Sequence, residues 1–150
     1  MTAGRGISHS EVSTVDASVL HGVQLWVALP DEVRHADPGF DHYAPGPVEG
    51  DGWTACVFLG SLLGSDSPVA TATPLLGAEL VLEPGAALTL DVDPAFEHGV
   101  LVDTGAVTVA GRAVGDSQQL ADGRFGIVTG DHLPPIPAPE LPAVRLRPRG

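Results

Sequence analysis

Short runs of β-forming residues, separated by glycine and proline turns, limit the fold of this 150-residue chain more than any other feature. These runs recur through residues 23–114, and few windows show the 3.6-residue period of an amphipathic helix. The first run, residues 23–29, alternates apolar side chains on one face and ends at Pro30. The sequence Glu83-Pro84-Gly85 predicts a turn, because proline presets φ and glycine permits positive φ. The pattern predicts an all-β sandwich or barrel.

Three further runs support the all-β class. Residues 55–59 are continuously apolar, which is typical of a buried strand, and residues 88–92 alternate leucine or valine with polar side chains. Residues 100–102 and 107–109 flank the turn sequence Asp103-Thr104-Gly105. That arrangement predicts a β-hairpin.

Two segments differ from this strand-rich body. Residues 35–53 mix Pro, Gly, Asp and His without periodicity, and they are expected to form a long surface loop. The tail from residue 131 onward holds six of the 14 prolines and three of the seven cationic residues. We expect an extended, polyproline-like C-terminal arm that cannot pair as a central strand.

Charge and composition exclude several classes of function. The net charge of −12 argues against direct nucleic-acid binding, since a phosphate backbone requires a cationic surface, and it favours basic protein surfaces as partners. The apolar run 55–64 is about half the length needed to span a bilayer. With no apolar leader in residues 1–11 and a single cysteine, a cytoplasmic location is expected.

His9 and Glu11 are the residues with the clearest capacity for chemistry. In an extended segment, residues i and i+2 project to the same face, so the imidazole and the carboxylate would point side by side. They supply one nitrogen and one oxygen ligand, which is half of a mixed set that suits non-heme iron, copper or manganese. His-x-Glu is nevertheless a common pattern, and a solvated strand edge is the competing interpretation. The five other histidines are expected to be solvated or in turns, and Cys56 is expected to be a buried, inert thiol.

Two longer stretches carry a specific resemblance. MTAGRGISHSE (residues 1–11) and GVQLWVALP (residues 22–30) closely resemble the pirin family, with Ala28 where that family usually has asparagine. LEPGAALTLDVDPAFEHGVLVDTGAVTVAGR (residues 82–112) resembles the second half of the same proteins. The resemblance covers residues 1–119.

The resemblance implies a bicupin, which consists of two jelly-roll barrels of the double-stranded β-helix type. Residues 1–60 would be the remainder of the N-terminal cupin half, residues 61–120 a partial C-terminal half, and residues 121–150 a proline-rich extension. The chain also looks internally shortened near residue 120, which would leave exposed strand edges through which it could form oligomers. Met1 matches a methionine that is internal in the family. A start assigned too far downstream and a truncated gene are the two explanations of this match.

The metal site of the family is implied only in part. Pirins resemble other cupins in holding one metal by a His-x-His pair and a later His-x-Glu pair, and His9 and Glu11 occupy the later pair. The earlier pair is absent from this sequence. Asp91, Asp93 and Glu97 stand near the positions where the second cupin half of a metal-binding relative would place ligands, and they could bind Ca²⁺ or Mn²⁺ or be ordinary surface acids.

Enzymatic and non-enzymatic functions both follow from the resemblance. Some pirins are similar to quercetin 2,3-dioxygenases, so a flavonol-like substrate and iron, or copper, manganese or nickel, are implied, with Glu11 taking the substrate proton. Two protein ligands rarely hold a catalytic metal, so the metal could be absent and little or no activity is expected. The alternative is a non-catalytic pirin-like module that regulates a protein partner, and a decayed fragment without function is the third possibility.

Overall fold

The computed structural model describes residues 1–16, 19, 21–93, 96, 98–115, 123–126 and 143–148, and these residues form strands, turns and extended segments without a helix. The all-β prediction is therefore confirmed. The strands are β1 Pro47–Gly50, β2 Trp53–Leu59, β3 Ser61–Leu62, β4 Ser65–Asp66, β5 Gly77–Leu82, β6 Ala87–Val92, β7 Leu101–Thr104, β8 Ala106–Val109, β9 Arg112–Gly115, β10 Gly123–Gly126 and β11 Ala143–Pro148.

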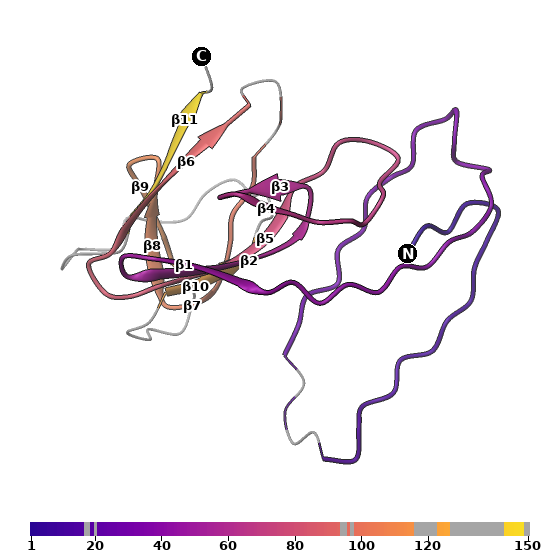
Figure 1. Ribbon diagram of the computed structural model, residues 1–150, viewed down its shortest axis with the longest axis horizontal. Coiled ribbons are helices and arrows are strands. Elements are labelled where there is room, and N and C mark those ends of the chain that lie inside the picture. Colours follow the sequence, from indigo (N-terminus) through magenta and orange to yellow (C-terminus); the bar gives the residue numbers. More distant parts are fainter. Residues whose placement is uncertain are drawn as a thin grey trace.

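Two larger sheets contain most of these strands (Figure 1). One is antiparallel with the order β1-β2-β5-β10-β7, and the other has the order β6-β11-β8-β9. Strands β3 and β4 form a small separate hairpin. The two-sheet arrangement agrees with the jelly-roll architecture that the resemblance implies. In the part of the chain that is described, no helix is long and apolar enough to cross a membrane.

The hydrophobic core lies between the two sheets. Strands β2 and β5 bury alternate residues, and their register places Ala55 beside Leu80 and Val57 beside Ala78. The same buried cluster contains residues of β6 and β8 from the other sheet, so the two sheets pack face to face. Its members are Ala55, Val57, Leu62, Ala78, Leu80, Leu82, Leu88, Leu90 and Val107. The strands predicted at residues 55–59 and 88–92 are confirmed as β2 and β6.

The predicted turn at residues 83–85 connects β5 to β6. Gly85 has φ +77°, and the amide of Ala86 donates a 3.0 Å hydrogen bond to the carbonyl of Glu83. Proline at the second position and glycine with positive φ at the third are typical of a type II turn. The turn carries the chain from one sheet to the other.

The predicted hairpin at residues 100–109 is wrong, although both of its strands exist. β7 and β8 belong to different sheets, so the chain changes sheet around Gly105 instead of turning back within one sheet. The hairpin is formed by β8 and β9, through Ala110 at φ 47° and Gly111 at φ 80°. Two successive positive φ values match the twist of paired strands, so this turn closes a hairpin.

The strand predicted at residues 23–29 is also wrong. No described strand includes these residues, and their side chains are largely exposed, with Trp26 at 88%. A strand requires a hydrogen-bonding neighbour, and none of the described strands pairs with this run. The predicted surface loop at residues 35–53 holds through residue 46, but β1 begins at Pro47 and Trp53 begins β2.

The expectation for the C-terminal tail needs a correction over residues 143–148. These residues form β11, which lies in the interior of its sheet and pairs in parallel with β6 and with β8. Five of the tail's prolines precede residue 143, and residues 143–147 are all able to donate a backbone hydrogen bond. The rest of the tail lies outside the described residues, and the predicted domain bounds stay predictions.

Truncation of a core leucine is expected to destabilise the fold. Leu82 in β5 is 1% exposed, so Leu82→Ala should lower the free energy of unfolding by about 2–5 kcal/mol in urea denaturation. The matched control is Leu101→Ala in β7, where the side chain is 40% exposed and the expected loss is below about 1 kcal/mol. Equal losses in the two variants would contradict the assigned core.

Gly60 and Gly64 provide a matched test of the turn geometry beside β3. Both have positive φ, 67° and 79°, so alanine at either position carries a strain of about 1–2 kcal/mol. A Cβ at Gly60 would lie 2.2 Å from the carbonyl oxygen of Leu75, whereas one at Gly64 would meet nothing within 4 Å. Gly60→Ala should therefore lower the melting temperature clearly more than Gly64→Ala, and the reverse order would disprove this packing.

Candidate metal centre

The first residues of the chain are held by a second segment that lies more than 30 positions later. Thr2 and Gly39 exchange two backbone hydrogen bonds, of 2.8 and 3.0 Å, and the amide of Arg5 donates to the carbonyl of Ala36 at 3.0 Å. Gly4 has φ +49°, and a Cβ there would lie 2.1 Å from that same carbonyl oxygen. Glycine at this position allows the two segments to approach each other. The pairing fixes the chain just before the candidate ligands.

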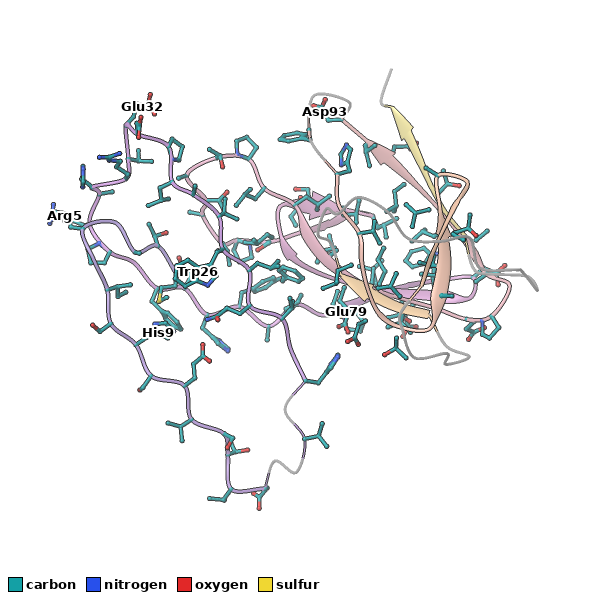
Figure 2. All side chains as sticks on the ribbon, turned by 180° about the vertical axis from the view of Figure 1, so that it is seen from behind. Arg5, His9, Trp26, Glu32, Glu79 and Asp93 are labelled. Carbon is teal, nitrogen blue, oxygen red and sulfur yellow. The ribbon has the colours of Figure 1, made fainter. Side chains whose placement is uncertain are left out.

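His9 and Glu11 lie side by side, as the i, i+2 spacing predicts. Their Nε2 and Oε1 atoms are 3.5 Å apart, and the two side chains are 40% and 78% exposed. Figure 2 shows His9 and Trp26 in the N-terminal part of the chain, away from Glu79 on β5 and from Asp93 just beyond β6. The pair therefore belongs to the extended segment and not to the packed sheets.

The donor atoms of this pair fit two neighbouring positions of a metal's coordination shell. Two ligand bonds of about 2.1 Å that meet at a right angle place their donors roughly 3 Å apart, close to the observed separation. A catalytic site normally has three protein ligands, and no group of three His, Cys, Asp or Glu side chains with suitable geometry occurs among the described residues. These residues alone do not fit a resident catalytic metal.

Two of the three residues in the second group of candidate ligands lie in the described part of the chain. Asp91 lies on β6 and Asp93 just beyond it, both exposed, while Glu97 lies outside the described residues. The ring of His98 binds backbone instead, with its Nε2 3.0 Å from the carbonyl oxygen of Asp93. Among the described residues, Asp91 and Asp93 belong to no group of three side chains that could hold a metal ion.

His21 makes a contact that sequence reasoning missed. Its Nε2 lies 2.8 Å from Oδ2 of Asp103 in β7, and the hydroxyl of Thr104 donates to the same oxygen at 3.2 Å. The contact joins the N-terminal segment to the five-stranded sheet. Because it connects residues 82 positions apart, local sequence carries no signal for it.

The remaining candidates have ordinary surroundings. The ring of His35 accepts a 3.1 Å hydrogen bond from Arg34, and Cys56 is half-buried in β2 rather than fully buried as expected. His42 lies in the exposed loop before β1, and His132 lies outside the described residues.

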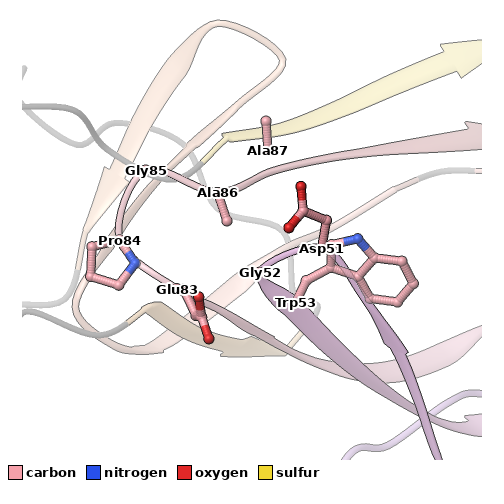
Figure 3. Close-up of a pocket in the computed structure, with 8 residues that line it drawn as sticks. All are labelled: Asp51, Gly52, Trp53, Glu83, Pro84, Gly85, Ala86 and Ala87. Atoms are coloured by element: carbon pink, nitrogen blue, oxygen red, sulfur yellow. The ribbon is translucent and has the colours of Figure 1, made fainter.

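One shallow pocket lies between the β1–β2 turn and the β5–β6 turn (Figure 3). The amide of Glu83 donates to the carbonyl of Gly52 at 2.9 Å and holds the two turns together. The carboxylates of Asp51 and Glu83 and the indole of Trp53 line the opening. Its acidic lining would attract cations, but two carboxylates in an open depression do not make a metal site.

Comparison with known proteins places this chain in a family. No family model matches the chain. A protein of Pseudomonas aeruginosa named "Putative quercetin 2,3-dioxygenase" is 42% identical over 130 residues, which is 85% of this chain and 41% of that protein. Human pirin is 32% identical over 87% of this chain and 45% of its own length, and a pirin-like protein of Caulobacter vibrioides is 35% identical over 79% and 43%. The chain belongs to the pirin family.

This pirin-family chain spans less than half the length of the curated relatives it matches. A solved quercetin 2,3-dioxygenase from Acinetobacter baumannii is 32% identical, covers 70% of this chain and 34% of its own, and superposes with a TM-score of 0.48. Membership in the family agrees with the resemblance of residues 1–11 and 22–30 to pirins.

Proposed function

We propose that His9 and Glu11 are one half of a pirin-type site for a divalent transition metal, iron or alternatively copper, manganese or nickel. We further propose that the chain by itself has little or no activity toward a flavonol-like substrate. The observation that carries this proposal is the 3.5 Å approach of Nε2 and Oε1 in an exposed segment. Two exposed ligands compete poorly with water and chelators, because tightly held metals have more ligands and an ordered set of supporting hydrogen bonds.

The surroundings of Glu11 also argue against efficient catalysis. A carboxylate works as a general base near neutral pH when burial raises its pKa toward that pH. The Glu11 side chain is 78% exposed, and its neighbour His9 is 40% exposed. In a complete site, Glu11 would be the residue that accepts the proton of a substrate hydroxyl. Because Glu11 is not enclosed, water competes for the proton and for the place that the substrate would occupy.

A non-catalytic, protein-binding role is the second candidate. The observation that favours it is the exposed apolar run around Trp26, which resembles an interaction surface more than a solvated loop. The net charge of −12 adds a preference for basic or neutral partners over acidic ones.

Metal binding should be weak and should depend on His9. Titration of the purified chain with Ni²⁺ in a calorimeter is expected to show binding that EDTA reverses fully, because only two side chains ligate. His9→Ala should abolish the binding, and His35→Ala, an exposed histidine paired with Arg34, should leave it unchanged. One metal atom per chain retained after dialysis against EDTA, and lost in His9→Ala, would show that further ligands exist.

Oxygenase activity should be near background. With quercetin, O₂ and added Fe²⁺, the loss of flavonol absorbance is expected to match the rate of Fe²⁺ without protein, since the ligand pair encloses no substrate. Glu11→Gln should have the same rate as the unaltered chain. Turnover well above background that is removed by Glu11→Gln would refute the inactive-half proposal and support an assembled catalytic site.

A further inference from the structure

We draw no further inference here: the strongest candidate, the shallow pocket between the β1–β2 turn and the β5–β6 turn, presents the exposed carboxylates of Asp51 and Glu83 beside Trp53, and nothing else among the described residues points to a ligand there.

Discussion

The contact between β2 and β5 supports the rest of the described structure. Alternate residues of both strands are buried, and their ladder brings Ala55 beside Leu80 and Val57 beside Ala78. The aliphatic side chains of β6 and β8 cover this face from the opposite sheet. Removal of apolar surface from water here stabilises both sheets at once.

Residues 1–46 contribute no side chain to the buried core formed by the described residues, and their properties follow from that fact. Among their described residues the strand-type pairing is limited to the isolated bridge between Thr2 and Gly39, and the contact of His21 with Asp103 links them to the sheets. Apolar side chains that would line a sheet remain in solvent. Figure 1 shows the open course of the backbone in this segment. A segment that is rich in strand-forming residues thus remains extended without becoming a strand.

The same lack of packing decides the chemistry of the candidate ligands. His9 and Glu11 have the donor types and spacing for a metal, but exposure leaves them accessible to water and without supporting contacts. The exposed apolar run and the exposed ligand pair are therefore two results of one cause, the absence of a packed barrel around residues 1–46 among the described residues.

The pattern of neighbouring residues in the sequence was sufficient to predict several elements of the fold. Alternation predicted β6, an apolar run predicted β2, and the Pro-Gly pair predicted the turn at residues 83–85, because each depends on neighbouring residues alone. The i, i+2 spacing likewise brought His9 beside Glu11. Only the tertiary structure decided the pairings: that β7 and β8 lie in different sheets, that β11 is central, and that residues 23–29 stay unpaired. Strand pairing depends on which distant segment is present to complete the hydrogen bonds, and local pattern does not contain that information.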